Sequence, residues 1–324
     1  PCYIYLILLN VKLNFYLSFM ENKLIVRIAE GLGNQLFMYA NAYSLSKKFN
    51  YKLYVDNTSG FIKTKNFREY YLDKFNITAP ITNNANKFDT FSSNIKRSFL
   101  KKIDFLRKNK QFIIEKRNMN KITEFNDVCY NKLSNKVFVE GHYESEKYFI
   151  NHKNELINEF TFKNIDDYKN NYYFDLIKKN SSNIVSISVR TNRFSERINN
   201  KFNDSSIQKS VLFIKDTIDY INRATLEIEK KISNPIYLIW SNDFTNLRSY
   251  FPNQEKFIFV ENKSNKIFQD FFLFNFCNNF IVGPTSFHWW GAWLNNNPNK
   301  ICLRPKNLNP SKNVDFWPKD WISI

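Results

Sequence analysis

The sequence predicts an α/β protein made of two doubly wound lobes. Its 324 residues exceed the roughly 250–300 residues at which a single hydrophobic core stops growing. Segments with strand-like and helix-like patterns alternate twice, once near the start and again after about residue 183, which is the pattern of parallel sheets covered by helices. Glycine is scarce, with 6 in the chain, and several glycines fall at turns between these elements.

The first lobe is predicted to begin with a βαβ unit. Residues 23–29 (KLIVRIA) have the pattern of a strand, 34–49 that of a helix, and 51–55 that of the next strand. Gly31 and Gly33 lie in the turn between the first strand and the helix. Because that turn follows the carboxyl end of a parallel strand, it lies where such sheets bind ligands.

The second lobe is predicted from a longer alternating series. Strands are expected at 184–189, 235–240, 256–260, 280–282 and 300–305, with helices at 205–231, 267–277 and 286–294. We therefore expect an N-terminal lobe over 20–165 and a C-terminal lobe over 166–324, with the linker between 162 and 183. Residues 1–19 are apolar but interrupted by polar side chains, and they barely reach the roughly 20 residues that span a bilayer. We expect Met20 to be the natural start and 1–19 to be a non-native upstream or disordered segment.

The charge of the chain is strongly positive. A formal net charge of +17 attracts nucleic acid, an anionic membrane surface or a phosphorylated small molecule. Many of the cations lie between Lys96 and Lys121, interleaved with Ile95, Phe99, Ile103 and Leu106 at helical spacing. This segment fits either a solvated helix face or a peripheral membrane contact. The four cysteines are far apart, which predicts neither a disulfide framework nor a zinc site and favours a cytoplasmic location.

The motif EGLGNQLF imitates part of a dinucleotide-binding fingerprint. Gly31 and Gly33 have the required spacing, and Asp56 ends the next strand where a ribose-binding acid would lie. Leu36 occupies the place of the third glycine. The motif is thus compatible with a structural tight turn or with an NAD-dependent Rossmann oxidoreductase.

Two further motifs favour binding of a diphosphate. In SVRTNRFSE, Arg190 and Arg193 directly follow a strand, and a guanidinium group makes paired charged hydrogen bonds to phosphate. In GPTSFHWWGAWL, a turn leads into a helix that begins at Ser286, where backbone amides suit a phosphate. Thr285 or Ser286 can cap this helix or contact a ligand oxygen. We expect His288 and most of the tryptophans in this motif to be packed in the core.

Together these motifs resemble the galactoside alpha-1,2-fucosyltransferase family, glycosyltransferase family 11. The resemblance covers nearly all of the chain after Met20. It is carried by GLGNQLFMYANAYSLS (31–46), FREYYLDKFNI (67–77), GHYESEKYF (141–149), WSND (240–243) and CNNFIVGPTSFHWWGAWL (277–294).

The resemblance implies a GT-B-like arrangement of two Rossmann-like lobes with a cleft between them. It implies an inverting transfer of L-fucose from GDP-fucose, held mainly by the C-terminal lobe, to the 2-hydroxyl of a terminal galactose in a lipopolysaccharide, O-antigen or lipooligosaccharide glycan. No metal or other cofactor is expected, and the chain has no Asp-x-Asp motif beside the expected site. The donor-binding residues expected on this basis are Gly31, Gly33, Arg193, Ser241, Thr285, Ser286 and Phe287.

One motif departs from the family pattern. Many members have His-x-Arg-Arg-x-Asp after the strand, whereas this chain has Arg-x-Asn-Arg-Phe-Ser-Glu, which is similar to a variant branch. The departure removes the family Asp as an acid or base. The resemblance assigns Arg190 to the leaving phosphates and Asn34 to a contact near the reacting centre. Glu30, Glu196 and Asp243 are the candidate general bases, and each is otherwise explained as an exposed carboxylate.

Two other functions remain as alternatives. The oxidoreductase depends on the glycine turn and Asp56 and leaves the two later motifs unexplained. A basic membrane- or nucleic-acid-binding protein depends on the net charge and on the segment 96–121. We expect no specific nucleic-acid partner, and peripheral attachment to the inner face of the cytoplasmic membrane is compatible with the transferase as well.

Overall fold

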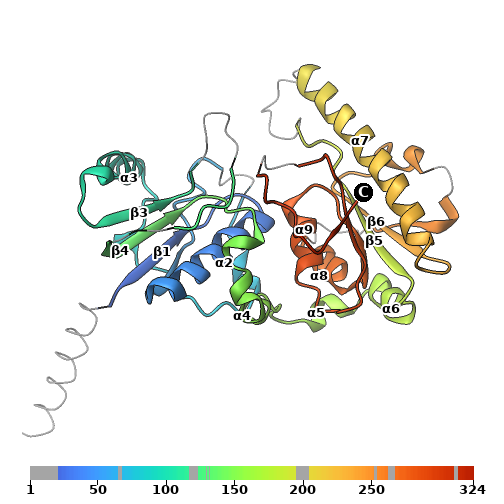
Figure 1. The fold of residues 1–324 in the computed structure, drawn as a ribbon, viewed down its shortest axis with the longest axis horizontal. Helices are drawn as coiled ribbons and strands as arrows, with labels where there is room; N and C mark the ends of the chain where they lie inside the picture. Colours follow the sequence, from blue (N-terminus) through green and yellow to red (C-terminus); the bar gives the residue numbers. More distant parts are fainter. Residues whose placement is uncertain are drawn as a thin grey trace, which may run out of the picture. The chain divides into compact units, whose positions relative to one another are not determined.

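The computed structural model describes residues 21–64, 68–116, 123–128, 130, 132–194, 204–251, 254–261, 267–309 and 313–324. The chain divides into two compact units, shown in Figure 1. Unit 1 consists of Pro1–Asn120 and Glu124–Glu159, and unit 2 of Lys121–Thr123 and Phe160–Ile324. The division lies a few residues before the expected boundary at 165/166. The expected segment 1–19 lies outside the described residues.

Unit 1 is a four-stranded parallel sheet with the strand order β2-β1-β4-β3. The strands are β1 (Lys23–Arg27), β2 (Lys52–Asp56), β3 (Lys110–Ile114) and β4 (Leu133–Glu140), and the helices are α2 (Leu32–Phe49), α3 (Phe91–Ile103) and α4 (Lys153–Glu159). Helix α2 covers one face of the sheet and α3 the other (Figure 1). The predicted βαβ unit is therefore present as β1, α2 and β2.

The segment 96–121 is only partly helical. Its helical spacing corresponds to α3 and to the 3-10 turn Asp104–Leu106, after which the chain forms strand β3. Asp104 is buried, and its carboxylate accepts hydrogen bonds from the amides of Gln111 and Phe112 at 2.9 and 3.3 Å. These bonds between residues seven and eight apart turn the chain from the helix into the sheet, and the helical spacing does not predict them.

Unit 2 is a six-stranded parallel sheet with the order β10-β9-β8-β5-β6-β7. The strands are β5 (Ile184–Val189), β6 (Ile236–Ser241), β7 (Phe257–Phe259), β8 (Asn279–Ile281), β9 (Cys302–Arg304) and β10 (Ile322–Ser323). The helices are α5 (Asp166–Lys169), α6 (Tyr172–Lys179), α7 (Asp204–Glu229), α8 (Ile267–Phe276) and α9 (Ser286–Trp293). Helix α7 packs on one face, and α8 and α9 pack on the other (Figure 1). Every residue of β5 is buried, as expected for a central strand covered on both faces.

Short 3-10 turns connect the main elements. They lie at Leu72–Lys74, Asn84–Asn86, Asp104–Leu106, Glu146–Tyr148, Ile150–His152, Leu247–Tyr250 and Gln254–Lys256. Within the described ranges, no helix combines the length and apolar character needed to cross a bilayer.

Candidate functional site

The carboxyl edge of the unit 2 sheet gathers most of the predicted donor-binding residues. Strands β8, β5 and β6 are neighbours and parallel, so the loops that follow them leave the sheet at one edge. Arg190 follows β5, Asp243 follows β6, and Thr285 lies between β8 and α9. Three segments that are far apart in the sequence thus meet at the position where doubly wound sheets bind ligands.

The loops after β5 and β6 are joined by asparagine side chains. The amide of Thr191 donates to Oδ1 of Asn242 at 3.1 Å, and Nδ2 of Asn242 donates to Oδ1 of Asn192 at 2.6 Å. Sequence reasoning missed Asn242, although it stands inside the WSND motif. The carboxylate of Asp243 accepts a hydrogen bond from the amide of Thr245 at 2.8 Å, so it has a local structural role as well as a candidate catalytic one.

The turn before α9 is positioned by a close backbone approach. The amide of Gly283 donates to Oγ of Ser188 at 2.7 Å, and any Cβ on Gly283 would overlap the backbone of Ser188. Glycine is required here because the turn touches strand β5. The contact fixes the start of α9 beside the end of the strand that leads into Arg190.

Helix α9 begins with a side-chain cap. Thr285 is the N-cap residue, and its Oγ1 accepts from the amide of His288 at 3.3 Å and lies 2.8 Å from the Nδ1 of the same residue. Burial and, to a smaller extent, the nearby charge of Arg190 together lower the pKa of His288 to about 3. His288 is therefore neutral at physiological pH, as expected for a packed core histidine. The arrangement places the positive charge of Arg190 near the positive end of the α9 dipole, a combination that favours an anion.

Two further predicted residues of this edge pack on aromatic rings, while Oγ of Ser241 donates to the carbonyl of Asp243 at 2.8 Å. The guanidinium of Arg193 lies 5.6 Å from the ring centre of Phe213, and the ring of Phe287 meets that of Phe271 edge-on at 5.0 Å. All three tryptophans of α9 are buried, which agrees with the packing role expected for most of them. Glu196, a candidate base, lies outside the described residues.

In unit 1, the predicted turn residues Glu30, Gly31, Gly33 and Asn34 lie together at the start of α2. Glu30 has a positive φ of 66°, and Gly31 is the N-cap of the helix. The carbonyl of Gly31 accepts hydrogen bonds from the amides of Asn34 and Gln35, each at 3.0 Å. A positive φ is uncommon for a glutamate, so the turn holds this side chain in a constrained direction.

Sequence reasoning missed the residue that anchors this turn. Gln35 is fully buried, and its Nε2 donates to the carbonyls of Glu30 and Glu69 at 2.9 and 2.7 Å. Its Oε1 accepts from the amide of Tyr71 at 2.9 Å. A glutamine on the otherwise apolar side of a helix was the signal that could have identified it. The Arg68 side chain also approaches the turn, since a Cβ on Gly31 would lie 3.5 Å from its Nη1.

Asp56 does not have the geometry expected of a ribose-binding acid. It is 1% exposed, and its Oδ1 accepts hydrogen bonds from the amides of Thr58 and Ser59 at 3.2 and 3.0 Å. The carboxylate caps its own turn instead of facing a ligand. The oxidoreductase alternative loses the residue on which it depended. Among the residues that the structure describes, no group of three or more His, Cys, Asp or Glu side chains is placed to hold a metal ion.

Comparison with known proteins identifies the family. The model of glycosyl transferase family 11 matches residues 12–324. The chain belongs to glycosyl transferase family 11. This confirms the resemblance seen in the sequence, and it makes the chain a glycosyltransferase.

Two bacterial relatives of this family 11 enzyme come from Escherichia coli. An alpha-1,2-colitosyltransferase is 25% identical over 312 residues, covering 93% of this chain and 98% of the relative. The O-antigen biosynthesis glycosyltransferase WbnK is 26% identical over 312 residues, covering 92% and 99%.

Solved structures confirm the predicted fold class. The NodZ alpha-1,6-fucosyltransferase soaked with GDP-fucose is 14% identical, with a TM-score of 0.50 over 85% of this chain and 92% of that chain. A mutant of Arabidopsis thaliana FUT1 in complex with GDP is 12% identical, with a TM-score of 0.50 over 89% and 71%. At this level of identity the likeness concerns the fold, which is the α/β, GT-B-like class.

Proposed function

We propose that this family 11 glycosyltransferase moves L-fucose from GDP-fucose to the 2-hydroxyl of a terminal galactose in a bacterial surface glycan. The observation that carries the proposal is that Arg190 and the capped start of α9 follow the neighbouring strands β5 and β8 at one edge of the unit 2 sheet, near enough for the charge of Arg190 to act on His288. A departing nucleoside diphosphate carries concentrated negative charge, and a guanidinium and a helix amino terminus are the groups that stabilise it. The names of the two Escherichia coli relatives support an alpha-1,2 linkage and an O-antigen type of acceptor.

The proposed reaction is a single displacement that inverts the anomeric carbon. The acceptor oxygen forms a bond to C1 of fucose while the bond from C1 to the diphosphate oxygen breaks, and GDP leaves with the electron pair. Arg190 and the first amides of α9 stabilise the developing charge on the phosphates without a metal ion. The acceptor proton goes to a carboxylate, for which Glu30, Glu196 and Asp243 are the candidates. Gly31 and Gly33 are proposed to contact the donor, and Asn34 the donor or the acceptor near the reacting centre. The proposed location of the reaction is the cytoplasm.

Calorimetric titration with nucleotides tests the donor site. The full chain is titrated with GDP, UDP, ADP and NAD, with EDTA present throughout. We expect micromolar binding of GDP alone, and at least tenfold weaker GDP binding by Arg190→Ala, since a bidentate charged contact is lost. Asp56→Asn is the matched control, because Asp56 caps a turn in unit 1. Binding of NAD without GDP would revive the oxidoreductase, and dependence of GDP binding on added Mg²⁺ would refute metal independence.

The sugar of the donor needs a separate experiment, because one relative is named a colitosyltransferase. Colitose lacks the 3-hydroxyl of L-fucose. A site that hydrogen-bonds a hydroxyl rejects the analogue lacking it far more strongly than an apolar pocket does. We expect kcat/KM with GDP-fucose to exceed that with GDP-colitose on a galactose-terminated oligosaccharide, with the 2-linkage of the product assigned by NMR. A reversed preference would assign the enzyme to colitose, and equal kcat/KM values would refute selectivity for fucose.

A further inference from the structure

Helix α3 carries one stripe of apolar side chains on the solvent side, while Leu100 packs against the core of unit 1. Phe91, Ile95 and Phe99 recur every four residues, so they form one stripe along the helix. They are 81%, 55% and 60% exposed, and none of the 13 residues of α3 is buried. A surface helix of a globular protein normally turns its apolar stripe toward the core. The apolar stripe of α3 is therefore additional to its core contact through Leu100, and the stripe is open to a partner.

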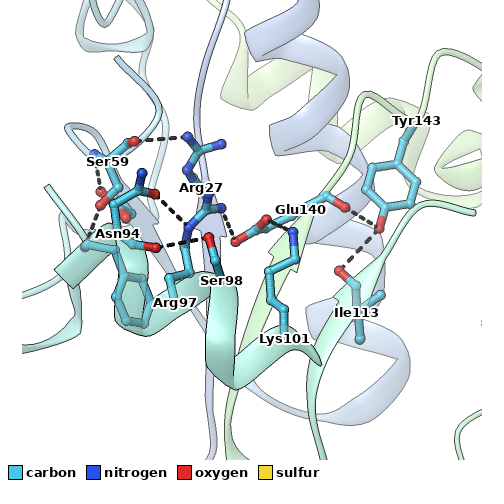
Figure 2. A network of polar contacts seen from close by, with 11 residues as sticks. Arg27, Ser59, Asn94, Arg97, Ser98, Lys101, Ile113, Glu140 and Tyr143 are labelled. Atoms are coloured by element: carbon cyan, nitrogen blue, oxygen red, sulfur yellow. Dashed lines mark hydrogen bonds and ion pairs between the residues drawn. The ribbon is translucent and has the colours of Figure 1, made fainter. Parts of the chain in front are cut away.

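The inward side of α3 explains how this orientation is held. Arg97 Nη1 lies 2.7 Å from Oε1 of Glu140, and Lys101 Nζ lies 2.6 Å from Oε2 of the same carboxylate (Figure 2). Glu140 ends strand β4 and is 8% exposed. Burial tends to raise the pKa of Glu140, but the hydrogen bonds and charges of Lys101 and Arg97 outweigh it and lower this pKa. The ion pairs of Arg97 and Lys101, together with the core contact of Leu100, thus fix one side of the helix against the sheet and leave the apolar stripe outside.

The apolar surface continues beyond the helix. Phe105 and Leu106, in the 3-10 turn that follows α3, are 75% and 72% exposed. Asp104 in the same turn is buried, and its carboxylate accepts hydrogen bonds from the backbone amides of Gln111 and Phe112. These bonds anchor the turn to strand β3. These exposed side chains project from a fixed backbone. We call residues 91–108 the α3 surface.

The exposed charges of the α3 surface are all positive. Its one carboxylate, Asp104, is buried, and the charged residues on its exposed part are Lys96, Lys102, Arg107 and Lys108. An apolar stripe rimmed by cations is complementary to an anionic bilayer, where rings enter the headgroup region and ammonium groups meet lipid phosphates. A second copy of the chain would place like charges opposite one another. Aliphatic Ile95 and Leu106 have no partner on the backbone of a nucleic acid.

We propose that the α3 surface docks this enzyme onto a membrane containing anionic phospholipid. The docking does not depend on the identity of the donor or the acceptor, because none of its residues belongs to the candidate catalytic site. It would hold the enzyme at the inner face of the cytoplasmic membrane, where a lipid-linked acceptor is accessible.

Vesicle co-sedimentation without nucleotide tests the proposal. The full chain is mixed with phosphatidylcholine vesicles with or without phosphatidylglycerol, and residues 1–19 are kept in every variant so that differences report on the α3 surface. We expect binding only with phosphatidylglycerol, weakening as salt rises. The double variant Phe91→Ser, Phe99→Ser should weaken vesicle binding by about tenfold or more. Lys96→Glu with Lys102→Glu should weaken it by about tenfold or more and reduce its salt dependence.

A control variant replaces one exposed apolar residue and one exposed lysine outside the α3 surface. Leu226→Ser with Lys231→Glu, on and just beyond α7, should bind vesicles like the parent chain, because Leu226 is similarly exposed at 60%. The α3 variants should keep the parent melting temperature and the parent rate of transfer to a soluble acceptor. Equal binding to both vesicle types, or unchanged binding by both α3 variants, would overturn the proposal. The proposal would also be overturned if the parent chain formed a dimer and the double variant Phe91→Ser, Phe99→Ser were monomeric. Salt-sensitive RNA binding without vesicle binding would overturn it too.

Discussion

The backbone amide of Gly283 donates a hydrogen bond to the hydroxyl of Ser188 at 2.7 Å, across a gap too narrow for any side chain on the glycine. Ser188 lies two residues before Arg190, and Gly283 lies two residues before the N-cap Thr285. The contact therefore sets the spacing between the guanidinium and the helix start that we propose to hold the diphosphate.

Replacement of Gly283 by alanine should strain this contact. We expect Gly283→Ala to lower the free energy of unfolding by about 1–3 kcal/mol, because the Cβ must displace backbone atoms of β5. Urea denaturation measures the loss. Gly31→Ala is the control, since its Cβ would lie 3.5 Å from Arg68 Nη1 and it should cost less than about 1 kcal/mol. Equal stability of Gly283→Ala and the parent would show that the turn is not held against β5.

Arg190 should act on the leaving group. We expect Arg190→Ala to reduce kcat with GDP-fucose by about 100-fold or more, as found when one preorganised donor to a developing charge is removed. Arg190→Lys keeps the charge and loses the planar fork, so it should recover part of the rate. Steady-state kinetics and a melting curve distinguish a catalytic defect from a folding defect. Normal turnover by Arg190→Ala would contradict the proposed mechanism.

The buried His288 should make the protein sensitive to acid. Its pKa is about 3 when folded, well below the ordinary value of 6.5. Between these values the unfolded chain binds a proton that the folded chain does not. The free energy of unfolding should therefore fall as pH is lowered from 6.5 toward 3, by up to about 1.4 kcal/mol per pH unit, with no contribution above 6.5. Denaturation from pH 7 to pH 5 measures this slope, and His288→Gln should flatten it. An unchanged slope in that variant would exclude His288 as the cause.

The carboxylate of Glu140 should be important for the stability of unit 1. Glu140→Gln leaves Arg97 and Lys101 with no carboxylate partner at the end of β4, and we expect a loss of about 3–5 kcal/mol in the free energy of unfolding. Asp127→Asn removes the partner of Lys48 at an exposed site, where the two side chains are 62% and 40% exposed. That change should cost less than about 1 kcal/mol. Similar costs for the two variants would show that the burial of Glu140 adds nothing.

The two ion pairs of Glu140 illustrate what a sequence pattern does not determine. The spacing of Ile95 and Phe99 indicated a helix, and α3 forms there. The pattern left open which side of the helix faces the sheet, because an apolar stripe normally points inward whereas the cations among these residues favour a solvated or membrane-facing side. The orientation follows from Glu140, about forty residues away in the sequence, whose buried charge must be paired, and from the packing of Leu100 on the core.

The sequence alone determined the class of fold, the family, and the order of the elements in β1-α2-β2 and from β5 to β9, but not strands β3 and β10 or helices α5 and α6. Strand and helix periods are local, and glycines or arginines at the ends of strands mark loops at the ligand-binding edge of a parallel sheet. Only the tertiary structure decided which loops touch, because strand order places β5 between β6 and β8, which are distant in the sequence. It also assigned Asp56 to a turn, and it showed that Gln35 and Asn242 hold the two candidate loops. Such roles depend on backbone groups brought close by folding, and the identity of a residue does not encode its partner.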